Sequence, residues 1–333
     1  MPGLVALPPN GIPRFYKGGP AIAELRGIEL GERVPEEWIA STTTVFGDDQ
    51  LGLSRLADGQ LLRDVIAADP EAWLGPDHVA RYGADPALLV KLLDAGERLP
   101  VHSHPDGPFA REHLGTKFGK TEAWIVIAAE PGARLHLGFR EPVSEEGLRD
   151  FVAEQDSGAM LGALNPIDVA AGDAVFVPAG VPHAIGEGLL IVELQEPSDM
   201  SVLVEWKGFA ADEDEATLGM GWPTALRSVD RDAIEVSKLQ RRRPEGAVAE
   251  LLPPAASAFF TAQRVAPASG AVRLEPGFAV IVVTDGAGRI ADLQVERGAA
   301  VLVPHAAGPV TAEGDLVAIV CRPPRSEEEA PTR

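Results

Sequence analysis

Two histidines separated by one residue, His102 and His104, constrain the fold of this sequence more than any other feature. Successive side chains of a β-strand point to opposite faces of a sheet. A strand over residues 99–104 therefore places both imidazoles on one face. A second strand is predicted over residues 123–128, because this run is apolar and of the right length for a buried strand. It places Glu122 at its beginning, so that a carboxylate can join the two imidazoles.

A third segment, residues 172–185, adds another histidine. Its apolar strand ends in a turn rich in proline and glycine, and the turn leads to His183. Three neutral imidazoles and one carboxylate are suitable ligands for a divalent first-row metal ion, with room left for water or substrate. A single histidine on an apolar strand is more often a hydrogen-bonded core residue or a surface residue. The combined pattern favours a metal site, and its predicted ligands are His102, His104, Glu122 and His183.

The same residues resemble the two signature motifs of the cupin superfamily. The first motif, a glycine followed after five residues by His-x-His, is matched by Gly96 and the His102–His104 pair. The second motif, a glycine followed after five residues by Pro-x-Gly-x-x-His, is matched without gaps by Gly172, Pro178, Gly180 and His183.

A typical cupin has its motif glutamate within a few residues of the second histidine, whereas here the glutamate follows a long insertion. The insertion ends in Gly-Lys-Thr-Glu-x-Trp at residues 119–124. In this it is similar to the type I mannose-6-phosphate isomerases, especially their short bacterial form. Segments 88–95 and 193–199 also resemble that family. The resemblance covers residues 10–210 well and residues 250–322 loosely.

Two positions depart from the family pattern. The family usually has Gln-x-His where this chain has His102 and His104, so the ligand set comes closer to the three-His, one-Glu pattern of cupin oxidases. The family also has an arginine close to the substrate, and Leu203 stands at the matching position.

The resemblance implies a metal-dependent aldose–ketose isomerase that converts mannose 6-phosphate to fructose 6-phosphate or acts on a related sugar. It implies zinc as the cofactor, with iron and manganese as alternatives, and a role for Lys120 in substrate binding or proton transfer. Lys207 is a candidate substitute for the missing arginine, and Glu205 is a candidate acid or base. Two other functions stay open: a metal-dependent cupin oxidase or dioxygenase, and a non-catalytic sugar-binding cupin, which Leu203 supports.

The predicted fold is mainly β, with two jelly-roll barrels and a small helical insertion. Short Val/Ile-rich runs divided by glycine and proline indicate the strands of both halves. The predicted order along the chain is a metal-binding barrel at residues 1–210 with the helical insertion at about 53–97, a connecting segment at 211–256, a second, metal-free barrel at 257–323, and a disordered tail at 324–333.

Two segments and two single residues carry more specific expectations. Within residues 53–96, apolar pairs recur at the i, i+3, i+4 spacing of a buried helix face, and the last of these pairs are in segment 88–93. Residues 105–120 are predicted to form a functional loop at the barrel mouth, where positive charge either attracts an anionic substrate or is simply solvated. Glu193, in a predicted core strand, either faces the cavity or is a structural carboxylate. His305 follows a strand that repeats the pattern before His183, but it stands alone.

Charge and cysteine content exclude some classes of function. The formal charge is −21, from 50 acidic and 29 basic residues, which argues against nucleic acid or an anionic membrane as a partner. The single cysteine, Cys321, excludes an intrachain disulfide and suits a reducing compartment. No run of eighteen apolar residues and no signal-like N-terminus is present, so a soluble cytoplasmic protein is expected, as a monomer or homodimer that binds a small sugar or sugar phosphate.

Overall fold

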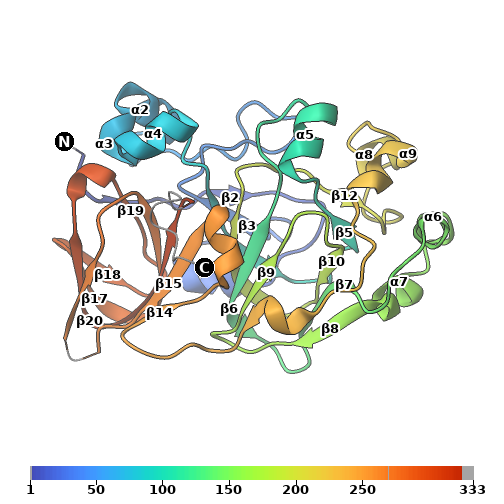
Figure 1. Ribbon diagram of the computed structural model, residues 1–333. Coiled ribbons are helices and arrows are strands. Elements are labelled where there is room, and N and C mark those ends of the chain that lie inside the picture. The colour runs from blue at the N-terminus through green and yellow to red at the C-terminus, as the bar shows by residue number, and fades with distance from the viewer. Residues whose placement is uncertain (1, 269, 325–333) are drawn as a thin grey trace.

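The structure is a computed structural model that describes residues 2–268 and 270–324. It is mainly β, as predicted, and its strands form three antiparallel sheets that lie side by side in Figure 1. The C-terminal sheet lies on the left of that view, a second sheet lies in the centre, and a third lies on the right. The expected closure into two barrels stays a prediction, as do the domain boundaries.

The central sheet has seven strands and supplies one wall of the site. In spatial order its strands are β13 (Gln240–Arg241), β9 (Ala174–Val177), β6 (Glu122–Ala129), β11 (Leu189–Gln195), β4 (Leu89–Ala95), β3 (Glu36–Ile39) and β2 (Gly11–Ile12). The right-hand sheet has five strands, in the order β12 (Val202–Leu203), β5 (His102–Ser103), β10 (His183–Ile185), β7 (Arg134–Phe139) and β8 (Leu164–Asp168).

The C-terminal sheet has eight strands. Its main path is β1 (Val5–Ala6), β19 (Ala300–Val303), β17 (Ala279–Ile290), β20 (Val310–Arg322), β15 (Thr261–Val265) and β14 (Val248–Glu250), while β16 (Ala271–Leu274) pairs with β20 and β18 (Leu293–Glu296) pairs with β17. The first strand of the chain, β1, thus pairs with β19 near the other end. The connecting segment also contributes a strand to another sheet, because β13 pairs with β9.

Helices and turns lie around the sheets (Figure 1). The α-helices are α1 (Ala21–Arg26), α2 (Leu62–Ala68), α3 (Pro70–Leu74), α4 (Pro76–Tyr82), α5 (Gly107–His113), α6 (Glu145–Glu154), α7 (Ser157–Ala163), α8 (Glu213–Ala216) and α9 (Trp222–Ala225). Short 3₁₀ helices are η1 (Leu226–Ser228), η2 (Val236–Lys238), η3 (Pro254–Ala258) and η4 (His305–Ala307).

The central sheet is buried on both faces. Alternate side chains of its strands, such as Val90 and Leu92, pack in a core shared with α2, α3 and the C-terminal sheet. The side chains between them, such as Leu93 and Trp124, pack against the five-stranded sheet. Burial on both faces explains why β4 and β11 are apolar almost throughout rather than alternating with polar residues.

The helical insertion is partly confirmed and partly wrong. Helices α2, α3 and α4 lie within it, but residues 89–95, which the spacing assigned to a helix, form strand β4. A fully apolar run satisfies the helical spacing and the buried-strand pattern equally well. Tertiary context decides here, because β4 pairs along its whole length with β11.

One other segment near the site differs in detail from its prediction. The expected loop at residues 105–120 contains helix α5, whose first turn is capped by the carboxylate of Asp106 accepting from the backbone N–H of Phe109 at 2.8 Å. Helix α6 begins after Ser144, whose hydroxyl accepts from Gly147 N–H. The predicted tail lies outside the described residues except for Pro324.

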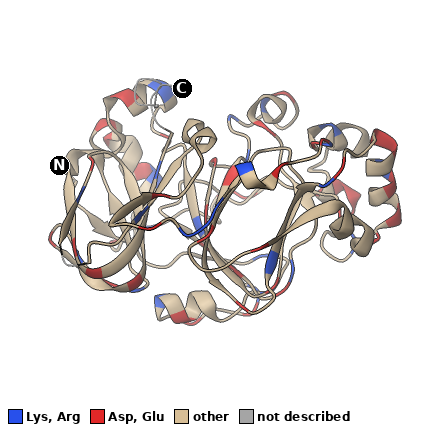
Figure 2. Ribbon diagram, turned by 60° about the horizontal axis from the view of Figure 1, so that its bottom comes forward, with Lys and Arg blue, Asp and Glu red and all other residues tan. Residues whose placement is uncertain are grey.

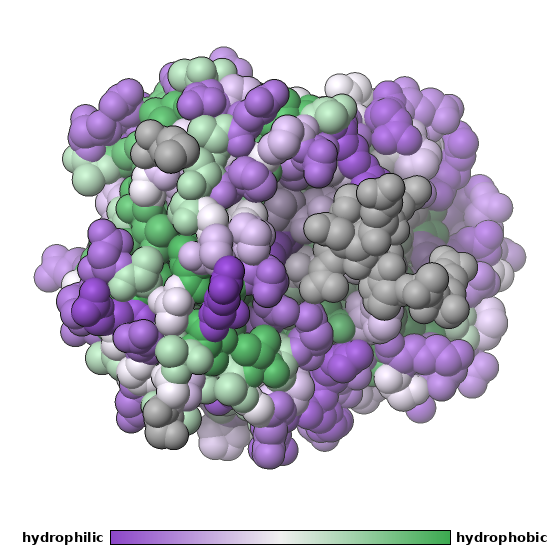
Figure 3. All heavy atoms as spheres, turned by 60° about the vertical axis from the view of Figure 1, so that its left-hand side comes forward, coloured by the Kyte–Doolittle hydropathy of each residue, from purple (hydrophilic) through white to green (hydrophobic). Residues whose placement is uncertain are grey.

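The surface carries the acidic character of the chain. Figure 2 shows Asp and Glu residues gathered on the helices of the right-hand side, where α6 and α8 both have acidic first turns. On the side of the molecule where the C-terminal sheet and helices α2–α4 lie, hydrophobic patches are interrupted by hydrophilic side chains (Figure 3). Within the described part of the chain, none of the helices is long and apolar enough to cross a membrane.

Candidate metal and substrate site

The four predicted metal ligands come from two facing sheets. His102 belongs to β5 and lies directly opposite His183, the first residue of β10, in the same sheet. His104 follows β5, and Glu122 is the first residue of β6 in the facing sheet. The pairing of β5 with β10 therefore brings the three imidazoles together within one sheet, and the packing of the two sheets brings the carboxylate to them.

The turn before His183 is fixed to the strand that carries the other histidines. Gly180 N–H donates to the His104 carbonyl at 2.7 Å, and the Ser103 hydroxyl donates to the Gly180 carbonyl at 2.8 Å. Gly180 has a φ of +88°, a conformation that side-chain-bearing residues rarely adopt. The conformation that glycine allows thus sets the approach of His183 to His102.

The ligand atoms converge closely. The Nε2 atoms of His102 and His183 are 3.0 Å apart, and the candidate ligand atoms of the three histidines all lie within 4.8 Å of one another. Glu122 reaches two of them: its Oε2 is 3.2 Å from His104 Nε2, and its Oε1 is 3.3 Å from His183 Nε2. All four side chains are buried. This arrangement can hold a metal ion.

The hydrogen bonds of the imidazoles fit metal binding. Each Nδ1 lies against a backbone carbonyl: His102 at 2.8 Å from Pro100 O, His104 at 2.7 Å from Met200 O, and His183 at 2.8 Å from Val181 O. A carbonyl only accepts, so each Nδ1 carries the proton and each Nε2 presents a lone pair. Three lone pairs and a carboxylate facing one another repel; the Lys120 ammonium offsets this at His104 and Glu122, and a metal ion would offset it for all four groups. The same Nδ1 contacts orient metal-binding histidines in general.

The pKa shifts of the four side chains favour the protonation states in which they can bind a metal. Burial lowers the pKa of His104 and of His183 to about 3, and it lowers that of His102 well below its usual value. For Glu122, burial by itself would raise the pKa. Lys120 and the neighbouring imidazoles outweigh it and hold the Glu122 pKa well below the usual range. Neutral imidazoles and an ionised carboxylate are the forms that bind a metal.

Lys120 lies beside the ligand set. Its Nζ is 2.8 Å from Glu122 Oε2 and 2.8 Å from His104 Nε2. The ammonium group is buried and can donate to both. A proton donor therefore stands directly next to the position where the ligand atoms converge.

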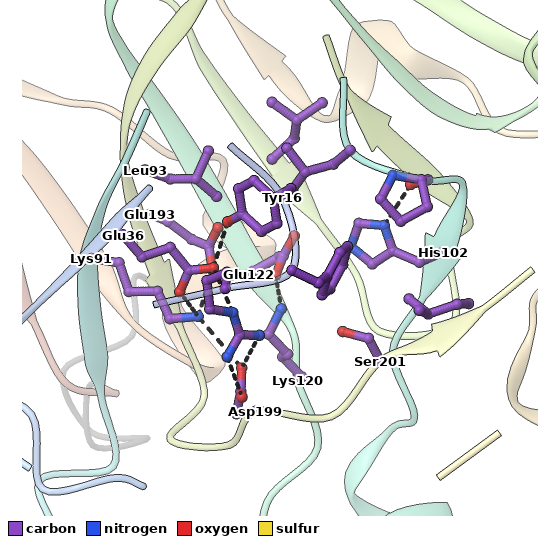
Figure 4. A pocket seen from close by; sticks show the side chains of 16 residues that line it. Tyr16, Glu36, Lys91, Leu93, His102, Lys120, Glu122, Glu193, Asp199 and Ser201 are labelled. Atoms are coloured by element: carbon purple, nitrogen blue, oxygen red, sulfur yellow. Dashed lines mark hydrogen bonds and ion pairs between the residues drawn. The ribbon is translucent and has the colours of Figure 1, made fainter. Parts of the chain in front are cut away.

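A second cluster of charged side chains lines the same cavity (Figure 4). Arg14 donates two hydrogen bonds to Asp199, at 2.9 and 3.1 Å, and its Nε lies 3.2 Å from Glu36. Tyr16 donates to Glu36 at 2.5 Å. Lys91 Nζ is 3.5 Å from Glu36, 3.5 Å from Glu193 and 3.9 Å from Asp199. Figure 4 shows this cluster on the side of Lys120 and Glu122 away from His102.

Glu193 faces the cavity, which was one of the two expectations for it. Its Oε1 is in ion-pair range of Lys91 but makes no hydrogen bond of good geometry with any described residue. Burial and the nearby negative charge of Glu122 raise the pKa of Glu193 to about 7, although Lys91 opposes the shift. A carboxyl group with this pKa can both accept and return a proton near neutral pH.

Sequence reasoning missed five residues of this cluster: Arg14, Tyr16, Glu36, Lys91 and Asp199. A usable signal was present at Lys91, a lysine in the middle of an apolar strand. Lysine and glutamate are almost never fully buried unless they are paired. The same signal applies to Glu193 in β11, which lies opposite Lys91 in the register.

The structure places the two other candidate catalytic residues away from this cavity. Glu205 accepts from Arg98 at 2.6 and 2.7 Å and from Val101 N–H at 2.9 Å, and it also accepts from the Ser157 hydroxyl. Lys207 is exposed, with its Nζ 5.6 Å from the centre of the Trp206 ring. Neither lines the cavity that contains Lys120 and Glu122.

Two other cations of the insertion, Arg111 and Lys117, bind outside the cavity. Arg111 donates to the Lys117 carbonyl, and Lys117 donates to the Tyr82 carbonyl at 3.0 Å and lies over the Phe118 ring. Leu203, by contrast, does line the cavity, next to His102 in the register of β5 and β12.

Comparison with solved structures identifies the fold. The structure of a putative mannosephosphate isomerase from Archaeoglobus fulgidus matches with a TM-score of 0.77 and 20% sequence identity, over 98% of this chain and 99% of that chain. Mannose 6-phosphate isomerase from Bacillus subtilis matches with a TM-score of 0.78 and 22% identity, over 96% and 100%. The chain has the fold of these isomerases.

Sequence comparison agrees. No family model matches the chain. It is 45% identical over 117 residues to mannose-6-phosphate isomerase of Streptococcus mutans, and 34% identical over 187 residues to the probable mannose-6-phosphate isomerase GmuF of Bacillus subtilis. These matches span 35% and 56% of the relatives' own lengths, and the same shares of this chain. The resemblance to mannose-6-phosphate isomerases is confirmed.

Proposed function

We propose that this protein is a metal-dependent aldose–ketose isomerase of the mannose-6-phosphate isomerase type. The observation that carries the proposal is the convergence of three Nε2 lone pairs and the Glu122 carboxylate beside a buried lysine. The similarity to mannose-6-phosphate isomerases in both sequence and fold supports the same reaction class.

Interconversion of an aldose and a ketose moves a proton between two neighbouring carbons while negative charge develops on oxygen. A divalent metal ion held by His102, His104, Glu122 and His183 would supply electrostatic stabilisation of that oxygen. Imidazole and carboxylate ligands suit zinc, which we propose as the native metal, and they also suit iron and manganese.

The remaining chemistry belongs to side chains of the chain itself. Lys120 donates a hydrogen bond to a substrate oxygen next to the ligand set, which favours the charged form of that oxygen. Glu193 takes the proton from one carbon and returns it to the next, because its pKa of about 7 suits both directions at neutral pH. Tyr16 and Glu36 orient the sugar hydroxyl groups. No role is assigned to Glu205 or Lys207, which lie outside the cavity.

The test begins with metal-depleted protein. Aldoses of mannose configuration, with and without phosphate, are incubated in D₂O with the depleted protein and with protein reloaded with zinc, manganese or iron. We expect ketose formation, and deuterium at the reacting carbons, only after reloading. Reloaded protein that binds metal at a 1:1 ratio but forms no ketose from any aldose contradicts the proposal.

The three-His, one-Glu ligand set favours one competing function, a metal-dependent cupin oxidase or dioxygenase. Oxygen uptake by the reloaded protein with small aromatic or thiol substrates tests it. Sugar binding without ketose formation or oxygen uptake instead supports a non-catalytic sugar-binding protein.

A further inference from the structure

We propose that Glu205 is a positioning residue of the metal site and acts on His102 through a single peptide group. The inference rests on the proposed function, because it concerns the metal ion that the site would hold. Glu205 lies outside the cavity and takes no part in the reaction steps described above. Its carboxylate is nevertheless only two hydrogen bonds away from one of the predicted ligands.

The connection is the peptide group between Pro100 and Val101. Its N–H, that of Val101, donates to Glu205 Oε2 at 2.9 Å. Its carbonyl, that of Pro100, accepts from His102 Nδ1 at 2.8 Å. A trans peptide group is planar and rigid, and its N–H and C=O point in opposite directions. One rigid unit therefore joins the carboxylate to an imidazole that would bind the metal.

This arrangement extends a general feature of metal sites. A metal-binding histidine donates its other ring N–H to a carboxylate, a carbonyl or water, which orients the ring and makes the ligand nitrogen more basic. Hydrogen bonds in a chain polarise one another, so a carbonyl accepts more strongly when its own peptide N–H donates to an anion. The Pro100 carbonyl should therefore act on His102 more strongly than an ordinary carbonyl does.

The carboxylate has the charge and the surroundings for this effect. Glu205 is 2% exposed, so little water screens its charge. Burial by itself would raise its pKa, but hydrogen bonds from Arg98, Ser157 and Val101 outweigh burial and lower the pKa. Arg98 binds both oxygens at 2.6 and 2.7 Å, and its side chain is 27% exposed, so water still solvates the guanidinium group. Glu205 is therefore an ionised carboxylate beside a buried peptide N–H.

The segment that leads to His102 is also held in place by Glu205 and its partner. Arg98 Nη1 donates to the Leu99 carbonyl at 2.8 Å, in addition to its contacts with Glu205. The backbone N–H of Glu205 donates to the Val101 carbonyl at 2.9 Å. Main chain and side chain of Glu205 thus contact the same residue, Val101, from opposite sides of its Cα atom. The peptide group that carries the acceptor for His102 cannot turn without breaking these contacts.

His183 provides a comparison within the same site. Its Nδ1 also lies 2.8 Å from a backbone carbonyl, that of Val181. The residue after Val181 is Pro182, which has no backbone N–H. No carboxylate can therefore accept a hydrogen bond from that peptide group. The imidazoles of His102 and His183 have the same contact distance, but only the first has a carbonyl that an anion can polarise.

The test follows the ring N–H protons of zinc-loaded protein with ¹⁵N-labelled histidine by nuclear magnetic resonance. Glu205→Gln removes the charge but keeps an acceptor for the Val101 N–H. A weaker acceptor moves the resonance of a hydrogen-bonded proton upfield. We expect Glu205→Gln to move the Nδ1–H signal of His102 upfield and to leave that of His183 in place. A His102 signal that does not move, or an equal shift of both signals, overturns the inference.

Zinc affinity gives a second readout. Competition with a chromophoric chelator is expected to show about tenfold weaker binding in Glu205→Gln, the lower end of the effect of outer partners of metal ligands. Ser157→Ala is the matched control, because it removes another hydrogen bond from the same carboxylate but keeps its charge and its contact with Val101. This control should retain the zinc affinity and both signals. An equal loss of affinity in Ser157→Ala overturns the inference.

The unaltered protein decides if Glu205→Gln does not fold. A stronger acceptor draws the proton away from nitrogen and so lowers the one-bond N–H coupling constant. The coupling constant of His102 Nδ1–H should therefore be smaller than that of His183 Nδ1–H. Equal values, or a smaller value for His183, overturn the inference.

The results separate this inference from the proposed function. A His102 signal and a zinc affinity that respond to Glu205→Gln support the inference even when no aldose is converted to a ketose. Isomerase activity together with a His102 signal that does not respond supports the proposed function and overturns the inference. Unaltered protein that binds no zinc overturns both.

Discussion

The two β regions of this protein use similar strands for opposite purposes. Between the five- and seven-stranded sheets, one end of the interior is lined by buried charged residues and a histidine, including Lys91, Glu122 and His102. The core within the eight-stranded sheet is formed by apolar side chains such as Ile281, Val301 and Val320. Whether a β-layer makes a site or a core is thus decided by which residues occupy its inward positions at one end of the strands.

The segments leading to His183 and His305 make the same point locally. Both have a glycine, an apolar strand and a proline: β9 precedes Pro178, and β19 precedes Pro304. After Pro178 the chain makes a turn of four residues and delivers His183 into a buried cluster. After Pro304 it enters η4 at once, and His305 packs against Gly75 instead. The turn, not the strand, makes the difference.

The largest effect is expected from removing His183, with removal of His305 as the comparison. His183→Ala should lower metal affinity by more than about 100-fold. Even mutation of a residue that only hydrogen-bonds to a metal ligand typically lowers metal affinity by about 10–100-fold. Isomerase activity should fall with it. His305→Ala should retain both, as measured by metal analysis of dialysed protein and by ketose formation. Full metal content in His183→Ala would contradict the assignment of His183, and not His305, as a metal ligand.

A core substitution in the C-terminal sheet should affect stability alone. Ile281 is fully buried there, so Ile281→Ala should lower the free energy of unfolding by about 2–5 kcal/mol. Chemical denaturation measures this loss. Metal stoichiometry and kcat of the folded protein should be unchanged, and a loss of metal would show that the two regions are coupled.

The charged residues between the five- and seven-stranded sheets should make the free energy of unfolding depend on pH. The pKa of Glu193 is raised to about 7 in the folded protein, so the folded state binds this proton more tightly than the unfolded state. Its stabilising contribution is present below pH 4.5 and is lost as the pH rises toward about 7, by up to about 3 kcal/mol.

Glu193→Gln should therefore flatten the pH dependence of unfolding between pH 4.5 and 7, measured by denaturant titration in the presence of a chelator. Glu187→Gln, on an exposed turn, is the matched control and should leave the profile unaltered. An unchanged profile in Glu193→Gln would show that another group carries this dependence.

The smallest effect is expected at the surface. Arg149 and Glu145 form an exposed i, i+4 pair on α6. Arg149→Ala should change the free energy of unfolding by no more than about 0.5 kcal/mol and leave activity intact. A decrease of several kcal/mol in the free energy of unfolding would mean that helix α6 stabilises the fold more than the exposure of this pair indicates.

Much of the local structure near the site was predictable. The strand beginning at Glu122 and the strand–turn–histidine order at His183 both depend on neighbouring residues, and both are confirmed. Strand β4 was predicted to be helical because a continuous apolar run fits the spacing of a buried helix and that of a buried strand equally well. The functional placement of Glu205 could not be predicted, since its partners are Arg98, Val101 and Ser157.

The sequence by itself determined which donor atoms this protein can offer a metal, because the two-residue period of a strand and the turn before His183 are local properties. Only the tertiary structure decided what surrounds them. Arg14 and Asp199 are 185 residues apart, and their pairing depends on the packing of separate segments around the two sheets. Charge neutralisation inside a cavity is set by distances of a few ångströms between side chains, and residue order alone does not specify those distances.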